Sequence, residues 1–214
     1  MINSLISLVN EKYPLSEIDC AEFAKMKING MNFSITAYRA EGLGHISVMR
    51  AKGFFGLMKM DTLIINPKEI ELPLYSYDRI YAAGNDTLIV ELYDTQSAEC
   101  DLGSLENVKN QYGDLSDRDP GEHWYDSIKL PSSISKKGKK TQTGRLDKLA
   151  TEHLSAYLNI CNKAESAEEK RRKAAYYVDG LLTNGGPSTD VFKKSLGVEK
   201  TAQLFKNILF GISK

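Results

Sequence analysis

The chain has 214 residues, of which 42% are hydrophobic and 26% charged, and its 28 basic and 28 acidic side chains give a formal net charge of zero. This composition predicts a globular protein with a real hydrophobic core rather than a disordered chain. The balanced charge argues against a general nucleic-acid-binding surface, and no stretch reaches the ~20 apolar residues that span a bilayer. The three cysteines are too widely spaced for a CxxC pair or a disulfide framework, so we expect a reduced, cytoplasmic protein.

The first half of the chain predicts a short helix followed by antiparallel strands. Apolar residues recur on one face of residues 2–12, which predicts a helix. Beyond it, alternating segments are separated by turn residues such as Asn29-Gly30, a pair that readily adopts the φ > 0 conformation of a tight hairpin. The pattern indicates about six strands in an antiparallel meander, over residues 23–28, 32–39, 45–50, 54–65, 72–83 and 87–93.

The second half of the chain predicts mainly helices. A short helix is expected over residues 102–112, followed by an irregular segment over 113–135 and a basic loop tip over 136–140. Strands followed by helices indicate an α+β fold with helices packed on an antiparallel sheet. We predict a single domain over residues 1–214, with a sheet-forming part over about 21–94 and a helical part over about 100–212. The remaining helices are expected over residues 145–160, 165–182, 188–196 and 199–210.

Sequence motifs for metal, nucleotide and nucleophilic sites are missing. The chain contains no HExxH or HxH pair, no GxSxG elbow and no Walker loop. The run from Glu41 to His45 contains glycines but lies between strands, so it lacks the strand–loop–helix context of a dinucleotide site. His153 falls on the apolar stripe of a helix and is interpreted as structural. The lysine-rich run over 136–140 is either solvated surface or a docking site for an acidic partner.

One carboxylate, Asp78, occupies an unusual place in the middle of a long internal strand. The alternation of a strand puts Asp78 on one face with Leu74, Ser76 and Ile80, and Arg79 on the other. If the C-terminal helices cover that face, desolvation should raise the pKa of Asp78, and the carboxyl could act as a general acid near neutral pH. The alternative is an edge-strand charge or an ion pair with a lysine.

Several blocks of the sequence, taken in order, resemble the ferredoxin-dependent bilin reductases. The blocks are Pro67 with Leu72-Pro73-Leu74, the strand over 90–94, the helical segment over 154–158 and the C-terminal stretch over 186–211 with its Leu-Phe ending. The resemblance implies a three-layer α/β/α sandwich with a central antiparallel sheet flanked by helices. The red chlorophyll catabolite reductases share this fold.

The resemblance also implies a function. In that family an open-chain tetrapyrrole binds between the sheet and the C-terminal helices, and electrons arrive singly from a reduced ferredoxin or flavodoxin. A radical mechanism without bound flavin, nicotinamide or metal follows, and Asp78 matches the main proton donor on the central strand. We therefore hypothesise a ferredoxin-dependent reductase of a bilin such as biliverdin, monomeric, and binding neither nucleic acid nor membrane.

The resemblance implies further substrate contacts. On the strand before Asp78 the matching position is Thr62, or Asp61 if the strand bulges. Ser76 shares the face of Asp78. In the turn before the penultimate helix, Ser188 is the matching residue, and Asp190 lies close by.

The turn over 185–189 also departs from the family. It lacks the Asn-Asp pair and the arginine that many members carry there. Two alternatives therefore stay open, a non-catalytic tetrapyrrole-binding module and a reductase of the same fold that acts on another natural product or a peptide. Arg145, Arg171 and Arg172 are equal candidates for binding substrate propionates, since arginine favours carboxylates.

Overall fold

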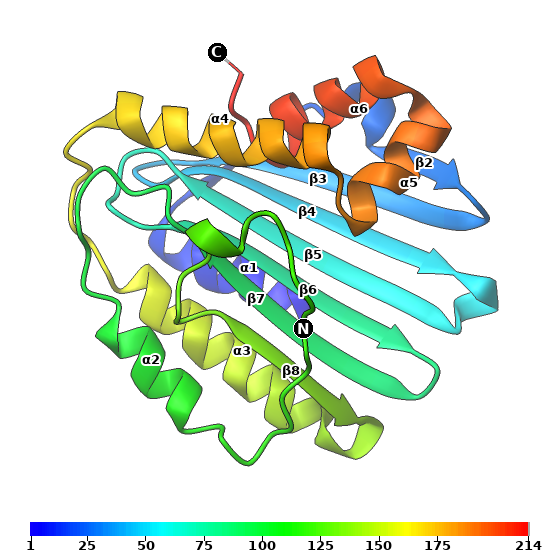
Figure 1. Ribbon diagram of the computed structural model, residues 1–214, viewed down its shortest axis with the longest axis horizontal. Helices are drawn as coiled ribbons and strands as arrows, with labels where there is room; N and C mark the ends of the chain where they lie inside the picture. The colour runs from blue at the N-terminus through cyan, green and yellow to red at the C-terminus, as the bar shows by residue number, and fades with distance from the viewer. Residues whose placement is uncertain (214) are drawn as a thin grey trace.

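The computed structural model describes residues 1–213, and within them eight strands form one antiparallel sheet. The strand order is β1-β3-β4-β5-β6-β7-β8, and β2 pairs with the first residues of β3 (Figure 1). Neighbours along the chain are therefore neighbours in the sheet from β3 to β7, as a meander requires. The strands are β1 (Leu15–Ile18), β2 (Lys25–Ile28), β3 (Met31–Ala40), β4 (Gly44–Gly53), β5 (Met58–Pro67), β6 (Leu74–Ala82), β7 (Asn85–Tyr93) and β8 (Ile134–Lys139).

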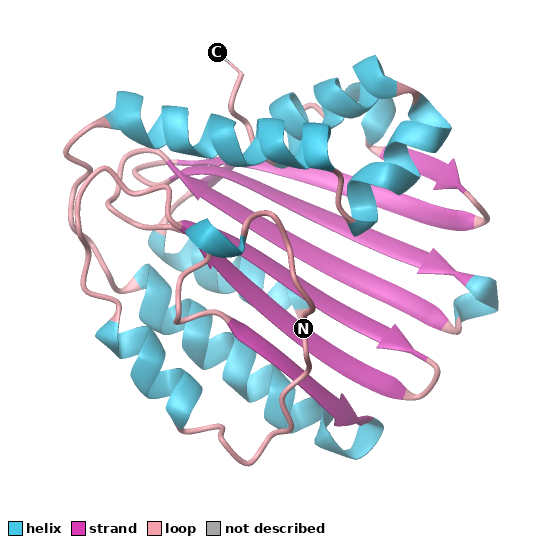
Figure 2. Ribbon diagram, viewed as in Figure 1, coloured by secondary structure: helices cyan, strands magenta, loops and turns pink. Residues whose placement is uncertain are grey.

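Helices cover both faces of the sheet, which gives the expected three-layer α+β sandwich (Figure 2). On one face, α1 (Ile2–Lys12), α2 (Gly103–Asn110) and α3 (Thr143–Leu158) enclose one hydrophobic core. On the other face, α4 (Ala167–Asn184), α5 (Pro187–Leu196), α6 (Val198–Gln203) and the π-helical turn η5 (Leu204–Leu209) enclose a second. Both faces of the central strands are therefore buried, with alternate side chains in different cores.

Local signals account for several of these boundaries. Asn29 and Gly30 both have positive φ and make the turn between β2 and β3, as the sequence predicts. Ala83 and Gly84 have the same conformation and join β6 to β7. At the start of α4, the hydroxyl of Ser166 accepts a hydrogen bond from an N–H of the first turn, which caps the helix.

Side chains of β4, β5 and the residue that follows β5 hold the end of the chain on the sheet. They donate hydrogen bonds to four consecutive backbone carbonyls that the helix end leaves without intrahelical partners. Burial lowers the pKa of His45 to about 4, so its imidazole is neutral and its Nε2–H donates. The bonds are His45 to Ile208 (2.7 Å), Ser47 to Leu209 (2.7 Å), Asn66 to Phe210 (2.7 Å) and Lys68 to Gly211 (2.6 Å).

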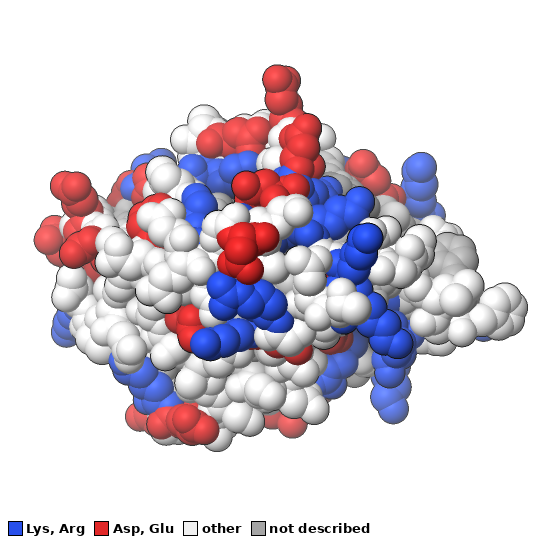
Figure 3. All heavy atoms as spheres, turned by 90° about the horizontal axis from the view of Figure 1, so that it is seen from below, with Lys and Arg blue, Asp and Glu red and all other residues white. Residues whose placement is uncertain are grey.

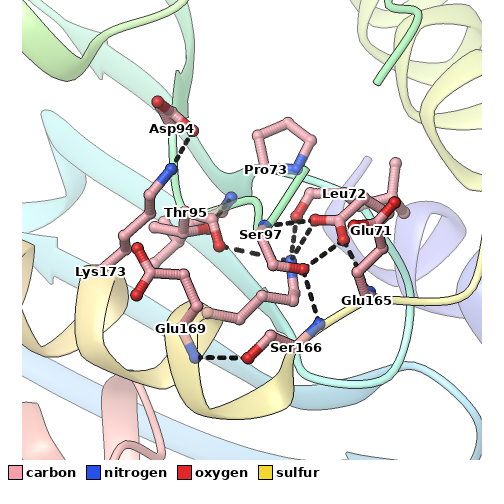
Figure 4. Close-up of polar contacts among 12 residues, drawn as sticks. Glu71, Leu72, Pro73, Asp94, Thr95, Ser97, Glu165, Ser166, Glu169 and Lys173 are labelled. Carbon is pink, nitrogen blue, oxygen red and sulfur yellow. Dashed lines mark hydrogen bonds and ion pairs between the residues drawn. The ribbon is translucent and has the colours of Figure 1, made fainter. Parts of the chain in front are cut away.

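A buried polar cluster fixes the start of α4 beside the ends of β6 and β7 (Figure 4). The carboxylate of Glu71 accepts hydrogen bonds from Ser97 and from the backbone N–H of Glu165. Lys170, from the first turns of α4, lies 3.9 Å from the same carboxylate and donates to the carbonyl of Leu72 at 2.7 Å. These contacts set the position of α4 over the sheet.

The segment over 136–140 differs from the sequence prediction. Residues 134–139 form the edge strand β8 instead of a basic loop tip, so the sheet extends beyond residues 21–94 at both ends. Lys136 is buried, pairs with Asp117 at 2.7 Å and donates to the carbonyl of Leu115 at 3.0 Å. The lysine run misled the prediction because its alternate members, Lys136 and Gly138, face inward in a strand.

The structure also bears on the predicted role of His153, the distribution of surface charge and the polarity of the helices. His153 is buried and hydrogen bonded to the carbonyl of Ser132, as predicted for a structural histidine. On the face seen in Figure 3, acidic and basic side chains are interspersed rather than separated. Within residues 1–213, every helix is too short or too polar to cross a bilayer.

Candidate active site

A cavity of about 270 Å³ lies between the sheet and the C-terminal helices. Its floor is formed by side chains of β4 to β7, and its roof by α4, η5 and the residues around them. The segment over 118–125 closes one side. The walls are mostly apolar and aromatic, with a few polar groups on the floor, which is the usual composition of a small-molecule site. The polar and aromatic side chains that line the cavity include Thr62, Ser76, Asp78, Glu91, Tyr93, Arg118, His123, Tyr125, Tyr177, Ser188 and Thr189.

Asp78 lies on the floor of this cavity, near the middle of the sheet. β6 pairs with β5 and β7 on its two sides, and Asp78 is opposite Thr62 and Ile89. The edge-strand alternative is therefore wrong. Among the described residues, Asp78 has no ion-pair partner within 4 Å, so the lysine pair is also not formed. Arg79 points to the other face, as the alternation predicts, and is buried with Asp86 at 2.6 Å.

The environment of Asp78 favours its protonated form. Burial raises the pKa of Asp78 to about 6, the hydroxyl of Thr62 lowers it by donating a hydrogen bond at 2.5 Å, and the nearby charge of Glu91 raises it. The side chain keeps some exposure, because part of it faces the cavity. A carboxyl with a pKa near 6 is partly protonated near neutral pH and can donate that proton to a group in the cavity.

Two of the expected contacts on the sheet share the face of Asp78. Thr62 and Ser76 both line the cavity. Asp61 does not, because β5 pairs with β6 without a bulge and places Asp61 opposite Arg79 on the other face. Asp61, the alternative contact if the strand bulged, therefore lies outside the cavity. Thr62 is the residue beside Asp78.

At the start of α5, the cavity is lined by Ser188, as expected, and by Thr189 instead of Asp190. Ser188 and Thr189 line the cavity, Thr189 being fully buried. Asp190 is exposed at the start of α5, with its carboxylate against Gly185, and does not line the cavity. Asp190, which the sequence offered as a substrate contact, is therefore not in the cavity with Asp78.

Sequence reasoning missed a second carboxylate in the cavity. Glu91 lies on β7 opposite Ser76, and the hydroxyl of Tyr93 donates a hydrogen bond to it at 2.6 Å. The alternation of β7 could have predicted this, because it places Glu91 and Tyr93 on the same face of the sheet as Ile89, the residue opposite Asp78. Tyr125 and Tyr177 complete an aromatic wall around Tyr93, at ring distances of 5.4 and 4.0 Å.

The arginine that lines the cavity is not one of the three that the sequence offered for binding propionates. Arg145 pairs with Asp114 at 2.8 Å and Arg172 with Glu169 at 2.6 Å, and neither lines the cavity, nor does Arg171. Arg118 does, from the irregular segment after α2. In the part of the chain that the structure describes, no ion pair is formed by its guanidinium.

Possible metal ligands are scattered rather than gathered. Across residues 1–213, the His, Cys, Asp and Glu side chains form no group of three or more that could hold a metal ion. The cysteines are free thiols in three different places. The cavity itself is lined by carboxyl, hydroxyl and aromatic side chains together with the guanidinium of Arg118 and the imidazole of His123.

Comparison with known proteins shows which fold this is. No protein-family model matches the chain, and no curated protein matches it in sequence. Among solved structures, selenomethionine phytochromobilin synthase from tomato, in complex with biliverdin, superimposes with a TM-score of 0.77 over 99% of this chain and 82% of that one, at 13% identity. At that identity the likeness concerns the fold, and it confirms the fold expected from the order of the sequence blocks. The chain has the three-layer fold of phytochromobilin synthase, a ferredoxin-dependent bilin reductase.

Proposed function

We propose that the protein is a reductase of an open-chain tetrapyrrole and receives single electrons from a reduced ferredoxin or flavodoxin. The observation that carries the proposal is the place of Asp78, a carboxyl with a raised pKa on the floor of a cavity between the sheet and the C-terminal helices. Support comes from the matching fold of a protein that binds biliverdin. A cytoplasmic monomer without bound flavin, nicotinamide or metal is part of the proposal.

The reaction needs two electrons and two protons for each double bond reduced. The first electron converts the conjugated substrate to a radical anion, whose added charge makes it a better proton acceptor. Asp78 gives its proton to that radical and becomes a carboxylate. A second electron and a second proton complete the product, and Asp78 then regains a proton from water. The protein contributes position and protons, while its partner contributes the electrons.

The walls of the cavity suit such a substrate. Tyr177 and the neighbouring rings provide flat apolar surface for a conjugated system. Arg118 and His123 lie at the side formed by the irregular segment, where they can meet the carboxylates of propionate groups. We propose Thr62, Ser76 and Ser188 as polar contacts of the ring nitrogens and carbonyl oxygens.

The test is an absorbance titration with biliverdin followed by anaerobic addition of reduced ferredoxin. Wild-type protein should shift the biliverdin spectrum on binding and then convert it to a reduced product. Asp78→Asn should bind with similar affinity but reduce the substrate ~10²- to 10⁴-fold more slowly and accumulate a radical. Asp61→Asn is the matched control, since Asp61 lies on the neighbouring strand but on the other face. Equal turnover by Asp78→Asn and Asp61→Asn would contradict the role of Asp78.

The same experiment separates the other candidate functions. A non-catalytic tetrapyrrole-binding module is favoured by the turn over 185–189, which lacks an acid and an arginine. That module would bind biliverdin but leave its spectrum unchanged after reduced ferredoxin is added. A reductase of another natural product or a peptide would not bind biliverdin at all. Stoichiometric flavin in a denatured extract would instead indicate a different class of reductase.

A further inference from the structure

One end of the sheet is left uncovered on the face opposite the cavity. The start of α1 reaches Arg50, whose guanidinium donates a hydrogen bond to Asn3. Beyond this contact the side chains of β2 to β5 on this face are largely exposed, Asn32 and Ser34 included. Residues of β2 to β4 line a shallow hollow of about 600 Å³ there. Five basic side chains of this region form the basic face: Lys25, Lys27, Arg50, Lys52 and Lys59.

The register of the strands gathers these five charges into two adjacent rows. One row runs from Lys27 through Lys52 to Lys59, and the other runs from Lys25 to Arg50. Lys52 and Lys59 are directly opposite each other, and like charges in that relation destabilise a sheet. Within residues 1–213, none of the five cations lies within 4 Å of a carboxylate. The basic face is therefore a cost to the folded chain that pairing inside the molecule does not offset.

The basic face is a local excess of charge on a chain whose 28 basic and 28 acidic residues cancel. Asp61 continues one of the rows, where it is opposite both Arg50 and Arg79, so a single carboxylate faces six cations. A surface of this kind attracts an acidic surface and speeds its approach. The charge therefore favours an acidic partner.

Exposed apolar side chains border the basic face at the hairpin between β4 and β5, which projects from one end of the sheet (Figure 1). Phe55 is fully exposed and Leu57 is 76% exposed. Phe55 and Gly56 both have positive φ, a conformation that suits Asn-Gly in a hairpin turn and is unfavourable for a bulky residue. Neither the turn nor the core accounts for a phenylalanine at this position. Exposed aromatic side chains beside basic ones are typical of a protein docking site, where the ring supplies an anchor and the charges set the orientation.

The basic face lies directly behind the floor of the cavity. Arg50 follows Met49 in β4, and Met49 lines the cavity. Lys59 precedes Met60 in β5, and Met60 lines it too. A partner on the basic face and a ligand in the cavity are thus on opposite sides of one sheet, a layer spacing of ~10 Å. This proximity matters for a partner that delivers electrons to the ligand, and it has no use for a lipid surface.

We propose that the basic face, with Phe55 as its apolar anchor, is the docking site of an acidic one-electron carrier that delivers electrons through the sheet to the substrate. The proposal rests on the proposed function. In each docking event the carrier is oxidised by one electron and the bound substrate is reduced by one, so two events serve one double bond. Electrons then arrive from one side of the sheet, and the proton of Asp78 arrives from the other.

Charge reversal of the two facing lysines tests the electrostatic part. Lys52→Glu with Lys59→Glu should weaken binding of an acidic iron–sulfur ferredoxin ~10-fold or more in calorimetric titrations at low salt. The difference should shrink toward zero near 1 M salt, where the screening length is ~3 Å. Biliverdin should bind this variant with wild-type affinity, and its reduction should be slow at limiting ferredoxin and recover at saturating ferredoxin.

Lys137→Glu with Lys139→Glu is the matched control. Both lysines are exposed on β8, at the far edge of the same sheet, and the change in net charge is the same. This control should bind ferredoxin as the wild type does, which would also exclude the lysine-rich run over 136–140 as the docking site.

Phe55→Asn tests the apolar part without harming the hairpin. Asn-Gly is the favoured pair for such a turn, so the variant should have the same Tm as the wild type or a higher one. It should nevertheless bind ferredoxin ~10-fold more weakly, because an aromatic anchor is lost. This loss should persist at high salt, since the variant changes no charge.

Each contrary result identifies what has failed. If Lys52→Glu with Lys59→Glu binds ferredoxin as the wild type does, or less is lost than in the β8 control, the basic face is not the docking site. If Phe55→Asn binds ferredoxin normally, Phe55 is not an anchor. If the wild-type protein sediments with vesicles of anionic phospholipid, and charge reversal removes that binding but not ferredoxin binding, the basic face contacts a lipid surface instead. If ferredoxin docks on the basic face and bound biliverdin is never reduced, the proposed function is wrong while the docking site stands.

Discussion

Replacing Asp78 by asparagine should stabilise the protein at neutral pH while abolishing its proton transfer. The raised pKa of Asp78 means that the folded state holds this proton more tightly than the unfolded chain does. The favourable contribution of the neutral carboxyl is fully present below its ordinary pKa of 3.8 and is lost as the pH rises through about 6. Asparagine is neutral at every pH and still accepts the hydrogen bond of Thr62, so the variant does not incur this loss.

The size of the effect follows from the two pKa values. A pKa raised from 3.8 to about 6 corresponds to ~3 kcal/mol, because each pH unit is equivalent to ~1.36 kcal/mol. Part of the carboxyl faces the cavity, where water screens the charge, so we expect a gain of ~1–3 kcal/mol for Asp78→Asn at neutral pH. For a chain of this length that gain corresponds to an increase in Tm of about 3–10 °C.

The assay is urea unfolding of wild-type protein and Asp78→Asn, followed by circular dichroism at a series of pH values. The two unfolding free energies should be closest near about pH 4 and should diverge in favour of the variant up to about pH 7. The difference between them cancels the titration of carboxylates that both proteins share. A constant difference across this range would refute the raised pKa, and a variant less stable at every pH would assign Asp78 a structural role.

Three other changes test the surroundings of the cavity. Thr62→Val removes the hydrogen bond that lowers the pKa of Asp78, so the loss of rate that occurs as the pH rises through this pKa should move to higher pH by up to about one unit. Gly180→Ala places a methyl group against the ring of Trp124, so it should cost ~1–3 kcal/mol and shift the fluorescence of the single tryptophan, measured against the unchanged secondary structure. Lys170→Met leaves the buried carboxylate of Glu71 without a cation, so it should lower the unfolding free energy by ~3 kcal/mol, measured by thermal and urea unfolding. A smaller loss than that caused by replacing an exposed lysine would contradict a stabilising role of the Glu71–Lys170 pair.

Local sequence patterns determined the antiparallel meander and the face on which Asp78 lies. A hairpin turn such as Asn29-Gly30 needs only two residues with positive φ, and strand alternation needs only neighbouring residues. These signals are contained in short segments, so the sequence predicts them without knowledge of the rest of the chain. The same rule also placed Arg79 on the opposite face, where the structure has it buried beside Asp86.

Tertiary packing decided the rest of the candidate site. Most of the lysine run over 136–140 forms a strand because it pairs with the free edge of β7. Lys136 is stabilised there by the carboxylate of Asp117 and the carbonyl of Leu115. Arg118 and Tyr177 reach the cavity from segments that are far from Asp78 in sequence. No local pattern records which side chains a loop and a helix bring to a sheet, because that choice depends on how their apolar faces pack. The sequence alone therefore determined the acid and its face, whereas the cavity around it exists only in the folded chain.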